Sequence, residues 1–489
     1  MKKEPLLNLL RSHFPVILFL IIYTLLIGWK LTAHPAPFYD WDEAIYAQVG
    51  REMVMHRSVI PLWQGANWLD KPPLAPLAYG VVETIAPLSP EISTRLFTLA
   101  LSAVTLILAY VLYLRLSRDK IIALLTVIIT GFVPIFVQRT QVLNVDIFLL
   151  LGWLGYLVFY EDFWPATVFL AVGVLSKSLL GFYPVGLLFL YYIFEHYYKK
   201  RSRKYTLSKL KPLLWQVLIL AAWYLAMTAI FRGNFIKYHF FDSHFKRVTA
   251  SIESHFGKRT FYLDLLFSQM GWILILTPVS LLFIVKKCLK TKNIGQLAFS
   301  LFFVPWFIFL NLTKTKIAWY LYPLFPQFAY LGISFLEFIK KNRPLYTVLI
   351  ILIVVILFYQ NIIKTPFFKG SYSGIESNIE MARYAASRCK QLEVLIDPDT
   401  RKTHAVLKSM NLLISTSEWW GNHPSIVYYS GRHVDFIYNP LSVASLAKNV
   451  PFLSCFVFYK GDSSSVPSVP SLSLLKDFGG LTLYQKNEL

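Results

Sequence analysis

The sequence predicts an α-helical polytopic membrane protein with about eleven transmembrane helices, followed by a small extracytoplasmic α/β domain. Of its 489 residues, 56% are hydrophobic and the mean hydropathy is +0.51, more than a soluble globular protein needs. Many apolar runs approach roughly the 20 residues with which a helix crosses a bilayer. Polar, strand-forming sequence replaces these runs only after about residue 360.

The first apolar run follows basic residues and precedes no small-residue cleavage site, so we interpret it as a retained helix rather than a signal peptide. Residues 164–176 and 179–195 are predicted as two crossings with Lys177 at an outer turn, because a single crossing would move the basic segment 199–211 to the other side. The predicted spans lie near residues 14–31, 93–114, 120–137, 144–160, 164–176, 179–195, 212–231, 265–285, 295–311, 317–338 and 344–360.

The net charge of +21 does not indicate nucleic-acid binding, because Lys and Arg concentrate in short loops between the apolar runs. This distribution is typical of membrane topology and of contact with lipid headgroups. By the positive-inside rule these loops are cytoplasmic, which predicts a multi-pass protein of the cytoplasmic (inner) membrane with a cytoplasmic N-terminus. The basic residues are Lys2, Lys3, Arg11, Arg115, Arg118, Lys120, Lys199, Lys200, Arg201, Arg203, Lys204, Lys209, Lys211, Lys286, Lys287, Lys290, Lys292, Lys340, Lys341 and Arg343.

The predicted membrane domain comprises residues 1–365, with a long first outer loop at 32–92, and the extracytoplasmic domain comprises residues 366–489. Cys389 and Cys455 could form a disulfide there or remain two buried thiols. Only Ser463–Ser473 is of low complexity. In this tail we predict a helix at Ile379–Cys389 and strands at Leu392–Ile396, Ser425–Tyr429, Val434–Tyr438, Phe452–Tyr459 and Leu481–Gln485.

An acidic cluster, Asp40, Asp42 and Glu43, follows the first span, where charges beside lipid are unfavourable and often functional. From Asp42 the pattern predicts a helix lying at the membrane interface, with Ile45, Val49 and Met53 on one apolar stripe. In a purely structural interpretation Asp42 is the N-cap and Glu43 a favourable first-turn charge. One aspartate can both cap a helix and accept a proton, so both interpretations remain open.

Two further ionic groups lie at predicted outer ends of spans. Lys71, which follows Asp70 and precedes two prolines, could extend to lipid headgroups or bind a phosphate. Arg139 and Asp146 flank the fourth span, where Asp146 could cap the helix and pair with Arg139. The nearby Trp63 and Trp68 are interpreted as interfacial anchors, and so is the Trp419–Trp420 pair of the tail, which could also contact an acceptor.

The outer loop at 232–264 is dense in histidine and charge. Together with Asp70 it could hold a divalent metal, although its spacing matches no closed zinc site and a solvated loop is the alternative. Lys314 and Lys316 lie in an outer turn, against the positive-inside trend, which points to an anionic ligand. The loop residues concerned are His239, Asp242, His244, His255, Lys258 and Arg259.

Taken in order, these segments resemble the polytopic GT-C glycosyltransferases, in the branch of the protein O-mannosyltransferases and the lipid A aminoarabinose transferase. The resemblance covers roughly residues 35–330 and is specific as an ordered set. Its motifs are Trp41–Ala47 with Arg51–Met53, Leu69–Pro73, Ser176–Ser178, Ser254–Arg259, Lys314–Lys316 and Tyr320–Pro323.

The resemblance implies a polyprenyl-phosphate-linked sugar donor, reaction at the outer membrane face and inversion at the sugar carbon. It implies catalytic roles for Asp42 and Asp146, and donor-phosphate binding by Lys71. Asp70 and His255 stand where some relatives bind a metal, but Asp70 replaces a glutamate and Ser176–Ser178 replaces Thr-Lys-Gly, which puts metal dependence in doubt. To donor-phosphate binding we also assign Arg259, Lys314, Lys316 and Arg139, and to support of the site Asp40, Glu43, Tyr46 and Lys177.

The sequence therefore predicts a hexosyl or pentosyl transferase that acts on a lipid, glycan or protein acceptor, with membrane lipid as a partner and no nucleic acid. A multipass transporter or flippase is disfavoured, because the charges gather at one face and the halves do not repeat. A polysaccharide ligase or polymerase of the O-antigen type is the third candidate. The sequence leaves the sugar and the acceptor open.

Overall fold

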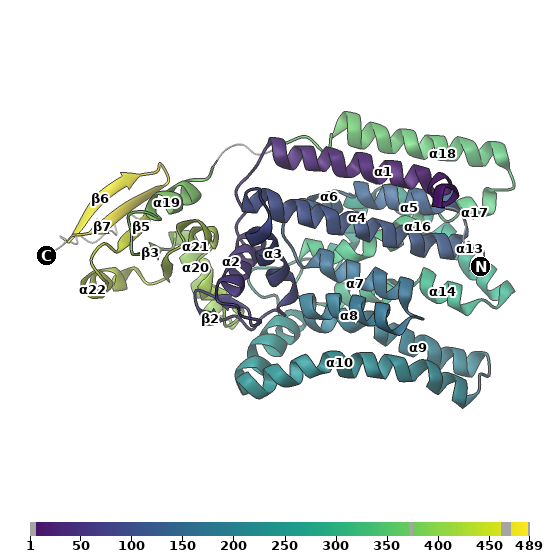
Figure 1. Cartoon of the computed structure of the whole chain (residues 1–489), viewed down its shortest axis with the longest axis horizontal. Helices are drawn as coiled ribbons and strands as arrows, with labels where there is room; N and C mark the ends of the chain where they lie inside the picture. Colours follow the sequence, from purple (N-terminus) through teal and green to yellow (C-terminus); the bar gives the residue numbers. More distant parts are fainter. Residues whose placement is uncertain (1–5, 371–374, 461–470, 488–489) are drawn as a thin grey trace. The chain divides into compact units, whose positions relative to one another are not determined.

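The computed structural model describes residues 6–370, 375–460 and 471–487 (Figure 1). Lys2, Lys3 and most of the Ser463–Ser473 run lie outside these ranges. The chain forms two compact units. The membrane unit comprises Met1–His34, Thr94–Gly233 and Gly257–Gly370, and the second unit, here called the loop unit, comprises Pro35–Ser93, Asn234–Phe256 and Ser371–Leu489. The predicted first outer loop and part of the 232–264 loop thus join the C-terminal tail.

All eleven predicted spans coincide with helical segments of the membrane unit. Among the described residues, five helices are long and apolar enough to cross a membrane, and the number rises to eight if each of three bent helix pairs is one span. The number eleven stays a prediction, because α7 has only 14 residues and residues 317–338 are broken into short pieces.

The helices of the membrane unit are interrupted at several prolines and glycines. The pair α5/α6 bends by 72°, α12/α13 by 103° and α14/α15 by 41°. The segments are α1 (Leu6–Ala33), α4 (Pro90–Ser117), α5 (Lys120–Phe132), α6 (Pro134–Thr140), α7 (Asp146–Phe159), α8 (Phe163–Lys177), η1 (Ser178–Phe182), α9 (Tyr183–Tyr198), α10 (Arg203–Phe235), α12 (Phe261–Met270), α13 (Ile273–Thr291), α14 (Ile294–Ser300), α15 (Val304–Leu312), η3 (Ala318–Leu324), α16 (Phe325–Ile333), α17 (Leu336–Ile339), α18 (Arg343–Phe358) and η4 (Tyr359–Lys364).

The α8–η1–α9 segment reverses direction at Ser178, whose φ is 58°. A Cβ built on Gly173 would lie 3.4 Å from the Cα of Gly181. In a helix that continued straight, eight residues would separate these positions by about 12 Å. Trp153 of α7 stacks on Tyr183 at 4.6 Å, which places the start of α9 beside α7. The two runs are therefore antiparallel arms with Lys177 at the turn, as the distribution of basic residues predicts.

The loop unit begins with two helices in close contact, α2 (Asp42–Met55) and α3 (Leu74–Ile85). A Cβ on Gly50 would lie 2.3 Å from the Pro76 carbonyl oxygen, so this approach of two backbones requires glycine. The predicted helix forms and Ile45, Val49 and Met53 are buried, but so are the polar Gln48 and Glu52, and the position of the helix at the membrane interface stays a prediction. Between the helices lies a hairpin of β1 (Leu62–Trp63) and β2 (Ala66–Asn67), and later come η2 (Ile236–Phe245) and α11 (Lys246–Thr249).

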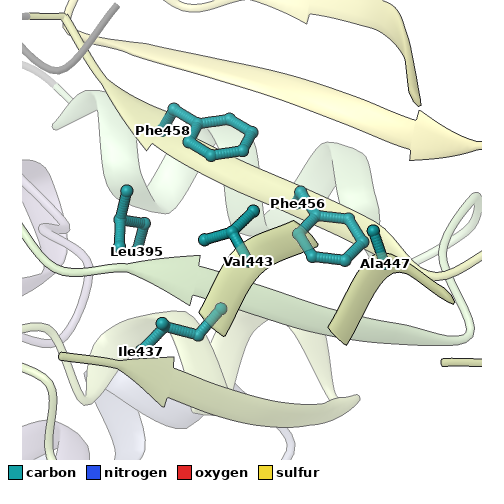
Figure 2. Packing of buried hydrophobic residues seen from close by; sticks show 6 residues of the cluster. All are labelled: Leu395, Ile437, Val443, Ala447, Phe456 and Phe458. Carbon is teal, nitrogen blue, oxygen red and sulfur yellow. The ribbon is translucent and has the colours of Figure 1, made fainter. Parts of the chain in front are cut away.

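The C-terminal part of the loop unit is a five-stranded sheet in the order β4–β3–β5–β7–β6, parallel at β4–β3–β5 and antiparallel at β5–β7–β6. Its core includes Leu395, Ile437, Val443, Phe456 and Phe458 (Figure 2). The elements are α19 (Ser377–Ala385), β3 (Gln391–Leu395), α20 (Pro398–Ser409), η5 (Ser417–Trp419), α21 (Ser425–Ser430), β4 (His433–Ile437), η6 (Pro440–Ser442), α22 (Val443–Asn449), β5 (Cys455–Tyr459), β6 (Leu472–Asp477) and β7 (Leu481–Lys486). A small α/β domain is confirmed.

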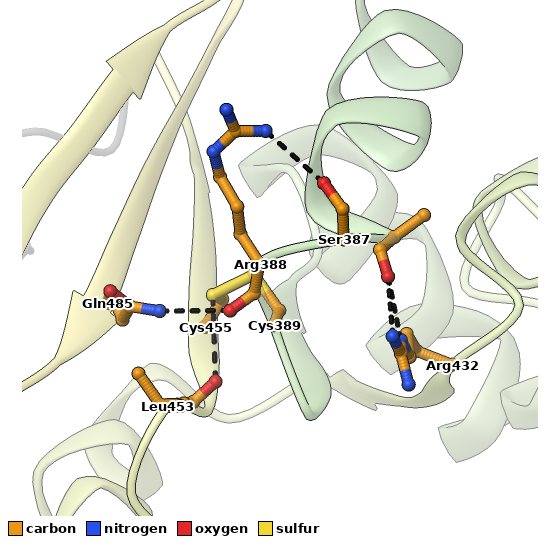
Figure 3. The surroundings of a disulfide bond; sticks show 8 residues. Ser387, Arg388, Cys389, Arg432, Leu453, Cys455 and Gln485 are labelled. Carbon is orange, nitrogen blue, oxygen red and sulfur yellow. Dashed lines mark hydrogen bonds between the residues drawn. A yellow bond between two sulfur atoms is a disulfide. The ribbon is translucent and has the colours of Figure 1, made fainter.

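One prediction for the tail is wrong, one strand was not predicted, and one alternative is resolved. The strand predicted at Ser425–Tyr429 is wrong: this segment is α21, which starts after Pro424 and ends at Gly431 in the left-handed conformation. Its β-branched and aromatic residues favour strands only weakly, and packing against α19 and α2 prevails. Strand β6 was not predicted. Cys389 and Cys455 form a disulfide (Figure 3).

Candidate active site

The acidic loop of the loop unit leads directly into α2. Asp42 is the first residue of this helix and is half-buried, and Trp41 occupies the cap position, so the interpretation of Asp42 as N-cap is wrong. Glu43, which is buried, accepts a hydrogen bond from the Tyr39 backbone N–H at 2.9 Å. Trp41 has φ 68° and ψ −121°, a conformation that costs a bulky residue about 1–3 kcal/mol.

Asp40 is held by the C-terminal part of the same unit. Its Oδ2 lies 2.7 Å from His423 Nδ1 and accepts a hydrogen bond from the Asn378 amide at 3.2 Å. Its Oδ1 accepts from the Ser425 backbone N–H at 2.9 Å. We call these four residues the Asp40 cluster. The three partners were not predicted, because they follow no local motif and lie more than 300 residues from Asp40.

Asp70 is buried, with 5% of its surface exposed. Its Oδ2 accepts hydrogen bonds from Trp68 Nε1 at 3.1 Å and from the Thr416 hydroxyl. Burial raises the pKa of Asp70 to about 6, although Thr416, the charge of Lys71 and Trp68 act in the opposite direction. Asp70 is therefore part of a hydrogen-bonded connection between the first loop and the tail.

The tryptophans near Asp70 are buried rather than interfacial. Trp63 and Trp68 are 2% and 3% exposed, and both contact the buried Trp420, at 4.7 and 6.0 Å between ring centroids. Tyr46 is also buried and lies 6.1 Å from Trp68. The prediction of interfacial anchors at Trp63, Trp68 and Trp420 is wrong, because these rings form an internal aromatic cluster between the first loop and the tail.

The predicted metal ligands do not form a closed site. His255 Nδ1 lies 3.2 Å from the Ile252 carbonyl, and His239 Nδ1 lies 2.9 Å from the Leu69 carbonyl. Asp242 Oδ2 accepts from both the backbone N–H and the hydroxyl of Ser415. Within the described ranges, no group of three or more His, Cys, Asp or Glu side chains could hold a metal ion. Metal dependence stays a prediction, and no chemical step below depends on it.

The membrane unit contains a buried ionic group at the start of α7. Arg139 Nη2 lies 3.1 Å from Asp146 Oδ2, and Lys177 contacts Asp146 Oδ1. The three side chains are 1–6% exposed. The Asn144 side chain caps α7 by accepting from the Ile147 N–H at 3.0 Å, so Asp146 is not needed as the cap. The predicted Arg139–Asp146 pair is confirmed, and Lys177 joins it.

Two aromatic rings adjoin this ionic group. The Arg139 guanidinium lies 4.8 Å from the Trp319 ring, and Lys177 Nζ lies 4.9 Å from the Tyr320 ring. Both rings belong to η3, next to the predicted Lys314/Lys316 turn. Tyr320 belongs to one of the predicted motifs, but its contact with Lys177 was not predicted. Arg139 and Lys177 are thus two buried cations that share one carboxylate.

The remaining predicted cations of the membrane unit differ in environment. Lys316 is buried and donates to the carbonyls of Leu310 and Asn311 at 3.1 and 3.0 Å, at the end of α15. Lys314 and Arg259 are exposed. Lys316 therefore stabilises a helix end in this structure, while Lys314 and Arg259 have side chains accessible to an anion.

Several solved structures match this chain in fold at low sequence identity. ArnT from Cupriavidus metallidurans, bound to undecaprenyl phosphate, matches with a TM-score of 0.61 over 96% of this chain and 97% of its own, at 13% identity. The oligosaccharyltransferase AglB from Archaeoglobus fulgidus, in complex with an inhibitory peptide and a dolichol-phosphate, matches with a TM-score of 0.60 over 98% of this chain and 75% of its own, at 13% identity. Both are GT-C glycosyltransferases. The chain has the GT-C fold.

The sequence comparisons agree with this fold. The family described as dolichyl-phosphate-mannose-protein mannosyltransferase matches residues 70–226 of this GT-C chain, from Asp70 into α10. An uncharacterized protein of Aquifex aeolicus (strain VF5) is 25% identical over 342 residues, which are 67% of this chain and 64% of that protein. The chain thus aligns with less than two thirds of that relative. The predicted resemblance to GT-C glycosyltransferases is confirmed, and the chain is a multi-pass membrane protein.

Proposed function

We propose that this GT-C chain is a glycosyltransferase that moves a sugar from a polyprenyl-phosphate-linked donor to a lipid, glycan or protein acceptor at the outer face of the cytoplasmic membrane. The observation that carries the proposal is the buried Arg139–Asp146–Lys177 group of the membrane unit. Two buried cations beside one carboxylate form an arrangement that suits an anion, which they can bind with charge-assisted hydrogen bonds. The phosphate of a lipid-linked donor is such an anion.

The comparisons support this class of donor. ArnT is bound to undecaprenyl phosphate and AglB to a dolichol-phosphate, two polyprenyl phosphates in proteins of the same fold. The matched mannosyltransferase family includes Asp70, Lys71, Arg139, Asp146 and Lys177 in its range. A transporter has no comparable support. A ligase or polymerase would use a similar donor and differs from our proposal in its acceptor.

Asp42 is the proposed proton acceptor. An acceptor hydroxyl attacks the sugar carbon bonded to the donor phosphate, its proton passes to the Asp42 carboxylate, and the polyprenyl phosphate departs with the bonding electron pair. This single displacement inverts the configuration at the carbon. A phosphate acceptor needs no base, and Asp42 would then orient it. The position of Asp42 at the start of α2 is fixed by the backbone conformation of Trp41 and by the hydrogen bond that the Tyr39 N–H donates to the Glu43 carboxylate.

The leaving phosphate gains negative charge during this step, which cations stabilise. We assign this role to Lys71, Arg139, Arg259 and Lys314, with Lys177 and Asp146 orienting Arg139 through their shared ionic contacts. Lys316 would have to exchange its carbonyl contacts for the phosphate. Binding of a divalent metal by Asp70 and His255 stays a prediction, and none of these steps requires it.

Asp42→Asn tests the assignment. Lipids and glycans of cells with and without the gene are first compared by mass spectrometry to identify the product. Purified wild-type and variant proteins are then assayed for that product with the membrane-lipid extract as donor. We expect the variant to lose at least about 100-fold in turnover while its melting temperature stays unchanged. Asp264→Asn, an exposed aspartate of α12, is the matched control. Near-normal turnover in Asp42→Asn contradicts the assignment.

A further inference from the structure

We propose that Asp40 is a positioning residue through which the C-terminal part of the chain sets the orientation of Asp42. The inference rests on the proposed catalytic role of Asp42. It assigns to the Asp40 cluster a function in the reaction rather than in folding alone.

The contacts of Asp40 fix its carboxylate from several directions. Both oxygens are used: Oδ2 faces His423 Nδ1 and the Asn378 amide, and Oδ1 accepts from the Ser425 N–H, at 2.7, 3.2 and 2.9 Å. Asn378 also donates to the Ser425 hydroxyl at 3.2 Å, so the partners are themselves connected. A carboxylate with three directed partners has little rotational freedom, unlike a single exposed ion pair.

The residues next to Asp40 are fixed in the same way. The Phe38 N–H donates to the Tyr429 hydroxyl at 2.6 Å, two residues before Asp40. On the far side, Arg51 of α2 donates to the Tyr428 carbonyl at 2.9 Å and lies 3.6 Å from the centre of its ring. The start of α2 is thus attached to α21 and its neighbours both before and after Asp42.

Trp41 connects the Asp40 cluster to Asp42. Its positive φ is a conformation that a bulky residue adopts only when its surroundings impose it, and its side chain is exposed, so packing of the indole does not impose it. The Asp40 cluster restrains Trp41 from the preceding side. On the following side, the Ile45 N–H donates to the Trp41 carbonyl at 2.9 Å, and the Ala44 N–H donates to the Tyr39 carbonyl at 3.2 Å. When the Asp40 contacts are lost, Trp41 can relax to negative φ and turn Asp42 away from its place.

The test compares Asp40→Asn, Trp41→Gly and the double variant in the product assay of the full-length protein. We expect Asp40→Asn to lower kcat about 10- to 100-fold, as misplacement of a reacting group by about 1 Å does, with KM for the donor changed less than about threefold. Glycine adopts positive φ without strain. We therefore expect Trp41→Gly to leave the melting temperature unchanged or higher, and the double variant to recover at least fivefold in kcat over Asp40→Asn.

Asp435→Asn, which removes an exposed aspartate paired with His433 on β4, is the matched control and should leave kcat unchanged. An Asp40→Asn protein that melts lower but keeps its kcat overturns the positioning role. A double variant no more active than Asp40→Asn overturns the part assigned to the Trp41 backbone. Asp42→Asn, assayed in parallel, separates these outcomes from a failure of the proposed function, because full activity there removes the premise.

Discussion

Replacing Asp70 by asparagine should stabilise the protein at neutral pH and less at acidic pH. Burial raises the pKa of this carboxyl from 3.8 to about 6 in the folded chain. Between these values the folded state keeps a proton that the unfolded chain releases. Raising the pH through this range therefore lowers the free energy of unfolding of the wild type, and the full penalty is present above about pH 7.

The size of the effect follows from the shift. About two pKa units correspond to about 3 kcal/mol, since one unit is about 1.4 kcal/mol. That shift already includes the hydrogen bonds from Trp68 Nε1 and the Thr416 hydroxyl to the charged carboxylate, and asparagine retains a carbonyl oxygen that can accept both of them. The gain is therefore about 3 kcal/mol, which raises the melting temperature by roughly 6–12 °C in a domain of intermediate size.

The assay is thermal unfolding of the detergent-solubilised full-length protein between pH 4.5 and 8.5, with Asp399→Asn as the matched control. Asp399 is on α20, and its side chain is 94% exposed, so its substitution should shift nothing. The difference between Asp70→Asn and the wild type should be smallest at pH 4.5, at about a third of its full size, and reach its maximum above pH 7. Adding EDTA or Zn²⁺ should leave this difference in melting temperature between the two proteins unchanged.

An Asp70→Asn protein that melts lower than the wild type at every pH refutes this reasoning. That result means that the ionised carboxylate is needed in the folded state. If added Zn²⁺ also stabilises the wild type and not the variant, Asp70 is a metal ligand, as the resemblance to relatives implied.

Two further predictions concern buried charges. Asp146→Asn should destabilise the membrane unit by about 3–5 kcal/mol, because Arg139 and Lys177 lose their countercharge inside the protein; adding Lys177→Met should recover part of the loss, and equal melting temperatures of the single and double variants would contradict the ionic interpretation. Burial and the charge of Asp435 on the neighbouring strand raise the pKa of Glu393 to about 7. Glu393→Gln should therefore stabilise the loop unit at pH 8, where the wild-type carboxylate is charged, and not at pH 5. After allowance for solvent screening we expect a gain of about 1 kcal/mol at pH 8. Melting scans at the two pH values measure this, and an unchanged or lower melting temperature at pH 8 would count against it.

The membrane unit could largely be predicted because its pattern is local and strong. Apolar runs have no alternative to helices in a bilayer, and the alternation of basic loops places the turn at Lys177 between two crossings. The α2 stripe of Ile45, Val49 and Met53 followed from helical periodicity alone. In the tail, where local preferences are weak, Ser425–Tyr429 has strand-forming residues and yet forms a helix, because tertiary contacts decide between the two.

The partners of the candidate site residues could not be predicted, because they are set by the tertiary fold. His423 and Asp40 are 383 residues apart, and Thr416 and Asp70 are 346 apart. Trp63 and Trp68 have the sequence context of interfacial anchors, but Trp420 buries them. No periodicity or spacing connects such distant positions, so the sequence identifies the acids and leaves open what they bind.

The acidic residues of the first loop and of the 232–264 loop have the composition of a metal site, and three consecutive hydroxyl groups of the tail bind them. Ser415 donates to Asp242, Thr416 to Asp70 and Ser417 to Glu253. These carboxylates come from two distant segments of the chain, and a cation would be the usual means of holding such acids together. Here each acid accepts a hydroxyl hydrogen from one short segment instead. A high density of carboxylates in a sequence therefore indicates that these groups need partners, either hydrogen-bond donors or a metal ion. Which of the two they have is decided by the fold.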